Sequence, residues 1–200
     1  MWSLNDYRTV LMAVGLIGVF VCCVPSVMLF ARLPPGETFS ELYVLGPGHM
    51  AEGYPFNVTG GVNYLVYVGV GNHMGSVAYY LLQVKFRNQT EPLPNSTSAV
   101  PSDLVSLYTY RVLIEDNSSS EVPLNFLLSD VSFSDNESTV GNILINGVQS
   151  TINEHSSWDT NSTGYYYQIF VELWIYEAKS DAFVFHNRFV NLWLNMTASS

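Results

Sequence analysis

Cysteine is nearly absent from this sequence of 200 residues. The two that occur, Cys22 and Cys23, are adjacent and lie inside an apolar run near the N-terminus. Beyond that run no disulfide can form, and a cupredoxin-type copper site, which needs a cysteine thiolate, is excluded. Val21 stands where a lipidation motif needs a small residue. We therefore expect the pair to pack within a helix, with S-acylation as the alternative.

Basic side chains are also scarce. The sequence has 7 Lys and Arg against 17 Asp and Glu. Of these charged residues, Asp6, Arg8 and Arg32 precede Leu33. The other 16 acidic and 5 basic residues lie beyond it. This excess of negative charge excludes nucleic acid and an anionic lipid surface as partners of that region.

Catalytic motifs are missing as well. The sequence contains no G-x-S-x-G motif, and its four histidines lack the spacing of a zinc enzyme. Glu115 and Asp116 lie at an expected turn, where solvated carboxylates are the simpler interpretation. The Gly60-Gly61 pair precedes an expected strand, so it is not a phosphate loop. We predict no enzyme activity, no catalytic residue, no cofactor and no small-molecule substrate.

A charge-free run extends over residues 9–31, from Thr9 to Ala31. As a helix it would be roughly 34 Å long, enough for a bilayer core of about 30 Å. A cleaved signal peptide is the alternative, but its apolar core is usually only about 7–15 residues long. We predict a short cytoplasmic N-terminus over 1–8, a single transmembrane helix over 9–31 and a proline-rich linker over 32–38. Membrane lipid is then a partner.

Seven N-x-Ser/Thr sequons all lie beyond this run. N-glycosylation takes place on the outer side of a membrane. We therefore predict a single-pass protein of the cell membrane, with a cytoplasmic N-terminus, an extracytoplasmic C-terminal domain and N-linked glycans. A composition rich in Asn, Ser and Thr is the alternative explanation. The candidate glycosylation sites are Asn57, Asn88, Asn95, Asn117, Asn136, Asn161 and Asn195.

The pattern from 39 to 197 is β throughout. Val, Ile and aromatic residues are abundant, and Gly, Pro and Asn clusters separate the apolar runs. The clearest hairpin joins two alternating segments through a turn from Glu177 to Ala182. We predict an all-β, immunoglobulin-like antiparallel β-sandwich domain over 39–197, preceded by the transmembrane helix. The expected strands are 39–45, 62–71, 76–87, 104–115, 123–133, 139–149, 164–177 and 183–196.

Two further features bear on binding. Trp174, Phe189 and Trp193 would share one exposed face, which is a candidate surface for contact with protein or glycan. Packing within the core is the alternative for these three side chains.

The segment 88–103 carries two sequons and three prolines, and we expect a solvated, mobile loop there.

Two His-Met pairs lie in expected turns. Imidazole and thioether ligands together suit Cu(I), if the two turns meet at one end of the sandwich. Chance repetition of an exposed dipeptide is the alternative. The residues are therefore weak metal candidates: His49, Met50, His73 and Met74.

Four sequence segments carry a resemblance to a known family. They are F-S-E-L-Y-V-L-G-P from Phe39, G-Y-P-F-N-V-T-G from Gly53, N-H-M-G-S-V-A-Y-Y from Asn72 and F-V-N-L-W-L-N-M-T from Phe189. Their order resembles the extracytoplasmic domain of archaeal membrane proteins in the domain-of-unknown-function 1616 family. The resemblance implies an archaeal envelope protein with a β-sandwich. It implies no reaction, so it assigns no catalytic residue.

The expected function follows from the location and the missing chemistry. We predict a non-enzymatic, membrane-anchored glycoprotein that is an accessory or structural subunit of a larger archaeal membrane complex. Its partners would be other membrane or envelope protein subunits. An envelope module that binds surface-layer or surface-filament protein is the alternative, and a copper-binding carrier is the third.

Overall fold

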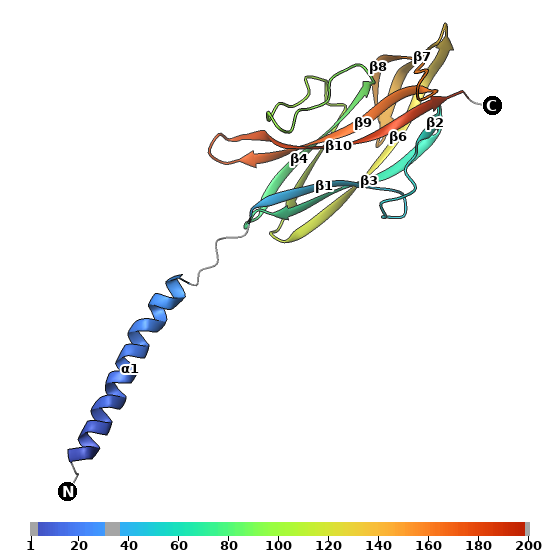
Figure 1. Ribbon diagram of the computed structural model, residues 1–200. Coiled ribbons are helices and arrows are strands. Elements are labelled where there is room, and N and C mark those ends of the chain that lie inside the picture. The colour runs from blue at the N-terminus through green and yellow to red at the C-terminus, as the bar shows by residue number, and fades with distance from the viewer. Residues whose placement is uncertain (1–3, 31–36, 199–200) are drawn as a thin grey trace. The chain divides into compact units, whose positions relative to one another are not determined.

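The computed structural model describes residues 4–30 and 37–198, with side chains described for 7–21 and 37–198. The chain divides into two compact units, Met1–Glu37 and Thr38–Ser200. The first unit holds one helix, α1, from Leu4 to Phe30. All ten strands lie in the second unit (Figure 1).

The expected transmembrane helix over 9–31 is not confirmed. In the part of the chain that the structure describes, no helix is both long and apolar enough to cross a membrane. The structure describes only part of the expected span, because the side chains of 22–30, including Cys22 and Cys23, and all of Ala31 lie outside the described residues. Positions 32–36 of the expected linker also lie outside them.

The second unit is an immunoglobulin-like sandwich of two five-stranded sheets, which confirms the expected all-β fold (Figure 1). The first sheet has the order β1-β3-β6-β7-β8, and the second has the order β2-β10-β9-β4-β5. Pairing is antiparallel except between β2 and β10, which run parallel. The strands span Phe39–Leu45 (β1), Asn57–Thr59 (β2), Asn63–His73 (β3), Ala78–Asn88 (β4), Tyr108–Ile114 (β5), Ser118–Ser134 (β6), Glu137–Ile145 (β7), Val148–Ser157 (β8), Tyr165–Glu177 (β9) and Ala182–Thr197 (β10).

Three strands, β2, β7 and β8, depart most from the sequence expectation. The expected strand 139–149 is divided, because Asn146 and Gly147 take positive φ angles of 47° and 83° in a tight turn. β7 ends before this turn and β8 begins after it. β2 was missed, since three residues form a strand here only by pairing with the end of β10.

The core lies between the sheets and follows a two-residue period. The β9–β10 hairpin turns between Glu177 and Ala182, as predicted. The inward face of β9 is formed by alternate residues that pack in or against the core, and full burial of an aliphatic one such as Leu173 contributes about 1.5–3 kcal/mol. These residues are Tyr165, Tyr167, Ile169, Val171, Leu173 and Ile175.

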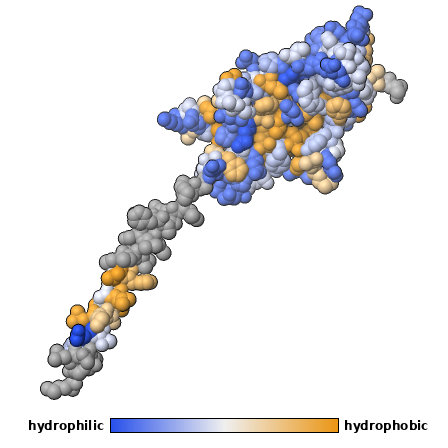
Figure 2. Space-filling model, viewed as in Figure 1, coloured by the Kyte–Doolittle hydropathy of each residue, from blue (hydrophilic) through white to orange (hydrophobic). Residues whose placement is uncertain are grey.

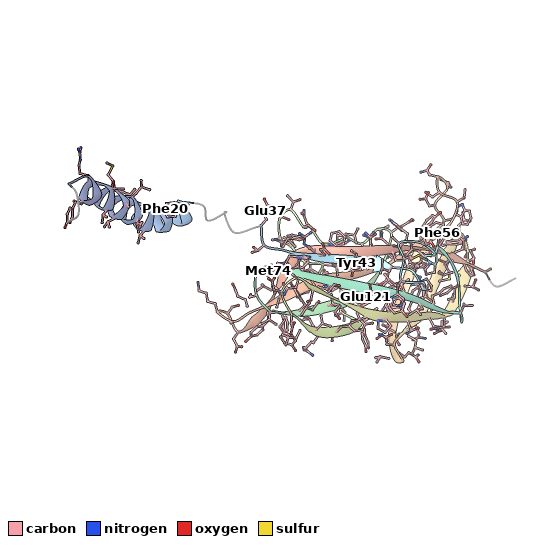
Figure 3. All side chains as sticks on the ribbon, turned by 90° about the horizontal axis from the view of Figure 1, so that it is seen from below. Phe20, Glu37, Tyr43, Phe56, Met74 and Glu121 are labelled. Carbon is pink, nitrogen blue, oxygen red and sulfur yellow. The ribbon has the colours of Figure 1, made fainter. Side chains whose placement is uncertain are left out.

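On the outer face of the first sheet, an aromatic ring lies across the neighbouring strand. Tyr43 of β1 pairs with Gly69 of β3, and a Cβ at Gly69 would lie 2.1 Å from the tyrosine ring. Figure 3 labels Tyr43 and, on β6 of the same sheet, Glu121. The missing side chain at Gly69 is therefore what lets Tyr43 cover β3.

A buried group of polar side chains joins the two sheets near one end of the sandwich. Ser40 of β1 lies 2.6 Å from the hydroxyl of Tyr80 on β4 and 2.9 Å from Nε2 of His186 on β10. His186 reaches this position from a β-bulge, where the pairing with β9 shifts between Phe185 and Arg188. The bulge therefore directs an imidazole inward to bond the opposite sheet.

Two tyrosines make similar connections elsewhere. The hydroxyl of Tyr167 on β9 donates to the backbone carbonyl of Ser138 on β7 at 2.7 Å. The hydroxyl of Tyr110 on β5 donates to the carbonyl of Pro123 on β6 at 2.6 Å. Burial raises the pKa of Tyr110 and the pKa of Tyr167 to about 12 each, so both remain donors across the neutral range.

The outer face of the second sheet is also buried along much of β9. Lys85 of β4 and Glu172 of β9 form an ion pair at 2.9 Å, with both side chains almost fully enclosed. Glu172 also accepts hydrogen bonds from the Ser102 backbone at 2.7 Å and the Trp174 indole at 3.1 Å. The Lys85 ammonium donates to the Ser102 carbonyl at 2.7 Å. Ser102 thus holds the β4–β5 connection against the sheet.

This contact corrects the expectation of a solvated, mobile loop over 88–103. Residues 95–100 are exposed, but Pro94 and Ser102 are buried. The reason is electrostatic, because a buried ion pair is stable only when its remaining donors and acceptors are satisfied. Ser102 supplies one of each.

We predict that His186 makes stability fall in mild acid. Burial, together with nearby Arg188, lowers the pKa of His186. The unfolded chain then takes up this proton at a higher pH than the folded chain, so stability is lost as pH falls below about 6.5. In urea unfolding between pH 7.5 and 5.5, His186→Gln should show a shallower loss, by at most about 1.4 kcal/mol per pH unit.

The control is His155→Gln, which changes an exposed histidine. It should retain the pH dependence of the unmodified chain. If His186→Gln also retained it, the buried imidazole would not be the group responsible.

We further predict that Lys85→Met destabilises the sandwich by about 3–5 kcal/mol, because the Glu172 carboxylate would be buried without its cation. The double variant Lys85→Met with Glu172→Gln should recover most of this loss, since a neutral amide still accepts from Ser102. Urea unfolding midpoints measure both. Additive losses in the double variant would contradict a role for the unpaired charge.

Candidate binding site

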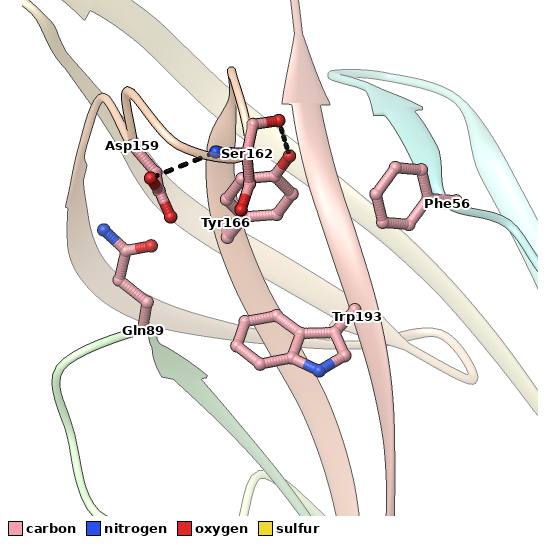
Figure 4. Close-up of a pocket in the computed structure, with 6 residues that line it drawn as sticks. All are labelled: Phe56, Gln89, Asp159, Ser162, Tyr166 and Trp193. Atoms are coloured by element: carbon pink, nitrogen blue, oxygen red, sulfur yellow. Dashed lines mark hydrogen bonds between the residues drawn. The ribbon is translucent and has the colours of Figure 1, made fainter.

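A pocket of about 280 Å³ opens at the outer face of the second sheet (Figure 4). Five parts of the fold contribute to it: the stretch before β2, the residue after β4, the β8–β9 loop, strand β9 and strand β10. The lining residues are Phe56, Gln89, Asp159, Ser162, Tyr166 and Trp193.

Three aromatic rings form one side of the pocket. The rings of Tyr166 and Trp193 are nearly perpendicular, at 88°, with centroids 6.2 Å apart. Phe56 lies 6.1 Å from Tyr166. The Tyr166 hydroxyl donates to the Ser162 carbonyl at 2.5 Å, which fixes the ring (Figure 4). Trp193 remains 43% exposed, so its indole is available to a bound molecule.

Asp159 and Gln89 lie on the side away from Trp193 and Phe56, while Ser162 lies beside Tyr166 (Figure 4). Oδ1 of Asp159 accepts the backbone N–H groups of Asn161 at 2.8 Å and Ser162 at 3.2 Å. This turn orients the carboxylate. Nε2 of Gln89 donates to the Ser157 carbonyl at 3.3 Å. None of the six lining residues is basic, so the pocket offers acceptors and hydroxyl partners instead of a cation.

A buried amide lies directly beside the pocket. Gln168 of β9 pairs with Trp193 of β10 and with Arg87 of β4, and it follows Tyr166 by two residues on the same face. It is fully buried. Within residues 37–198, it is the one buried side chain whose nitrogen and oxygen both lack a hydrogen-bond partner. Such groups are rare and usually have a reason.

A larger groove of about 500 Å³ follows the open edge of the sandwich. Val44 of β1 and Tyr54 line one side, and Phe189, Val190 and Leu192 of β10 line the other, with Asn191 between them. From Ala182 to Leu194, β10 pairs only with β9 among the described strands. Figure 2 shows apolar side chains gathered in the middle of this face, between hydrophilic margins.

The expected aromatic face is only partly exposed. Trp193 is open to solvent in the pocket and Phe189 lines the groove. Trp174 is half-buried, packs 5.8 Å from Phe185 and donates to Glu172. The proposed contact surface is therefore divided into two separate sites.

The two His-Met pairs do not meet. His49 stacks on Tyr67 at 3.8 Å, while His73 lies at the other end of β3. Six strand residues separate Tyr67 from His73, or about 20 Å. Figure 3 labels Met74 at the end of the sandwich opposite Phe56.

Each histidine has other partners. Nδ1 of His49 lies 2.6 Å from Glu121, and Nε2 of His73 lies 3.6 Å from Glu41. The described residues contain no cluster of three or more His, Cys, Asp or Glu suited to a metal ion. The geometry on which the copper hypothesis depends is therefore not present.

The seven sequons differ in how their amides are held. Nδ2 of Asn88 donates to Glu154 at 3.1 Å, and Nδ2 of Asn195 donates to Asn57 at 3.0 Å. Nδ2 of Asn117 donates to Asp116. Asn95, Asn136 and Asn161 are exposed in turns, with no partner for Nδ2 among the described residues.

The pocket residues were missed by sequence reasoning, apart from Trp193. Phe56, Gln89 and Asp159 stand far apart in the chain and share no motif. They converge because β2 pairs with the end of β10, and because the end of β4 pairs with the beginning of β9, which the β8–β9 loop precedes. No local signal in the sequence predicts this convergence.

Comparisons with known proteins identify a family for the chain but no functional site. No curated protein matches the chain. The solved structures that resemble it include a β-glucosidase from Listeria innocua in complex with gluconolactone, at 10% identity and a TM-score of 0.42. The alignment covers 80% of this chain and 16% of that one, so the chain spans about a sixth of the enzyme's length.

Another similar structure is the CARDB domain of a Pyrococcus furiosus protein in complex with di-metal ions, at 8% identity and a TM-score of 0.41. It aligns with 84% of this chain and 95% of its own. The matching family model begins within the predicted linker and ends at Glu137, the first residue of β7. It therefore does not include the segment from Phe189 that contributed to the resemblance. Residues 33–137 match the family described as Domain of unknown function (DUF1616), and the chain belongs to this family.

Proposed function

We propose that this chain is a non-enzymatic, extracytoplasmic accessory or structural subunit of a larger membrane protein complex, in an archaeal envelope. The observation that carries the proposal is the open edge of β10 beside the apolar groove. The occupant we propose is an extended segment of a partner subunit.

The edge of β10 offers hydrogen-bonding groups along its backbone. Between Ala182 and Leu194 it has a partner strand on one side only. Exposed edges usually carry some protection because they add strands readily, and here a β-bulge between Phe185 and Arg188 interrupts the edge. The stretch from Arg188 to Leu194 is regular and is therefore the part we propose for strand addition. Addition of a partner strand would satisfy these groups, while apolar pockets beside the edge would select its side chains.

The groove favours an apolar segment over a charged one. Its lining contains no acidic or basic side chain: it consists of five apolar or aromatic residues and Asn191. Val190 and Leu192 also pack against the core, so the groove floor is rigid. Tyr54 is held in place by its hydroxyl, which donates to the Val44 carbonyl at 2.8 Å.

The support for a membrane anchor is the sequence alone. Residues 9–31 contain no charged side chain, and all seven sequons follow this stretch. A membrane location would also bring the sandwich into the same compartment as the outer parts of membrane complexes. The N-terminus would then be cytoplasmic and the sandwich extracytoplasmic.

We predict that native membranes retain the chain after an alkaline carbonate wash, because it is anchored. A photo-crosslinking amino acid in place of Asn191 should then capture one membrane protein in these washed membranes. Tyr54→Ala in the same chain should reduce this crosslink severalfold, because it removes one wall of the groove. Immunoblotting of the crosslinked species and mass spectrometry measure the yield and identify the protein.

The matched control is Tyr176→Ala, since Tyr54 and Tyr176 are both 37% exposed and Tyr176 lies at the hairpin tip. This variant should crosslink normally. Release of the chain by the carbonate wash would count against the anchor. An equal crosslink yield with Tyr54→Ala would count against the groove.

We also predict which sequons carry glycans in the native protein. Asn95, Asn136 and Asn161 should be modified, because a glycan on their exposed amides displaces no side-chain hydrogen bond. Asn88 and Asn195 should be unmodified, because their Nδ2 groups are engaged in the fold. Glycopeptide mass spectrometry of the chain from native membranes tests this order. Modification at Asn88 with none at Asn95 would reverse it.

A further inference from the structure

We propose that the pocket formed by Phe56, Gln89, Asp159, Ser162, Tyr166 and Trp193 binds a single pyranose ring of a glycan. This site is separate from the groove proposed for the partner subunit, and the two share no lining residue. The source of the glycan rests on the extracytoplasmic location in the proposed function, whereas the binding of a sugar ring by the pocket does not.

The aromatic side of the pocket suits the apolar face of a sugar. A pyranose presents C–H groups on one face and hydroxyls around its rim, so an exposed indole can pack against that face. Trp193 provides such a surface, and its ring is supported at nearly a right angle by Tyr166. Phe56 closes the adjacent side (Figure 4).

The polar side suits hydroxyl groups. The Asp159 carboxylate and the Gln89 carbonyl oxygen lie across the pocket from Trp193 and Phe56, and Ser162 lies beside Tyr166 (Figure 4). These groups can accept or exchange hydrogen bonds with the sugar rim. With a carboxylate and no basic residue in its lining, the pocket disfavours phosphates and carboxylates. A neutral polyol is therefore the favoured ligand class.

The size of the pocket limits the ligand to one ring. Its volume of about 280 Å³ falls at the lower end of the range for ligand sites. Gln168, the cross-strand partner of Trp193, adds a buried donor and acceptor without partners beside the pocket.

The ring can come from two sources. Three sequon positions directly adjoin lining residues: Asn57 follows Phe56, Asn88 precedes Gln89 and Asn161 precedes Ser162. Of these, Asn161 has a free, exposed amide, so a glycan there could fold back into the pocket of its own chain. A glycan from another envelope molecule is the other source.

The test uses the full-length chain in detergent, both from native membranes and from a host that adds no N-glycans. The probes are the methyl glycosides of glucose, mannose and N-acetylglucosamine, measured by calorimetry. We expect the glycan-free chain to bind at least one of these glycosides with a dissociation constant of about 1 mM, because so small a ligand makes few contacts. Trp193→Ala should weaken binding about tenfold or more.

Trp158→Ala is the matched control, because Trp158 is 39% exposed and packs on Tyr165, outside the pocket. It should bind as the unmodified chain does. If native and glycan-free chains bind equally, the ring comes from another molecule. If the native chain binds only after enzymatic removal of its glycans, the ring is its own.

Three results would overturn the proposal. One is the absence of glycoside binding in both preparations. Another is equal weakening by Trp158→Ala and Trp193→Ala. The third is tighter binding of choline than of every glycoside, which would show that the rings and Asp159 form a cation site.

Discussion

Glu172 carries its carboxylate in the middle of β9, where both faces of the strand are buried, and this placement governs the outer face of the second sheet. A buried carboxylate needs a cation and further donors. Lys85, the Ser102 backbone and the Trp174 indole supply them. The requirement draws the β4–β5 connection across the sheet. One charged pair thus determines the course of a loop that its composition alone would leave in solvent.

Much of the fold could be predicted because its signals are local. Alternating apolar residues located the β9–β10 hairpin, and one face of that alternation in β9 packs against the core. β8 was hidden because it turns polar residues toward the protein: Ser156 is buried and bonds the Tyr166 carbonyl. β2 was hidden because three residues carry no period. In both cases tertiary contacts, and not local pattern, make the strand.

The sites were less predictable than the fold, because they depend on which ends of strands meet. His49 and His73 have the same neighbour in sequence, yet β1 and β3 place them at opposite ends of one strand pair. Phe56 and Trp193 have nothing in common in sequence, yet the parallel pairing of β2 with β10 brings them to one pocket. The chain belongs to the DUF1616 family, and this membership identifies neither cavity.

The burial of Lys85 and Arg87 has a practical consequence for handling the protein. In residues 37–198, Lys179 is then the one exposed lysine, and it lies in the turn between β9 and β10. Amine-reactive reagents would couple this part of the chain to a surface through Lys179 alone. For trypsin, Lys179 is the one basic residue that lies in an exposed turn of this part. Lys179 lies just before the first residue of β10, Ala182, whereas Trp193 lies near the other end of the strand. Immobilisation through Lys179 would therefore leave the pocket facing the solvent.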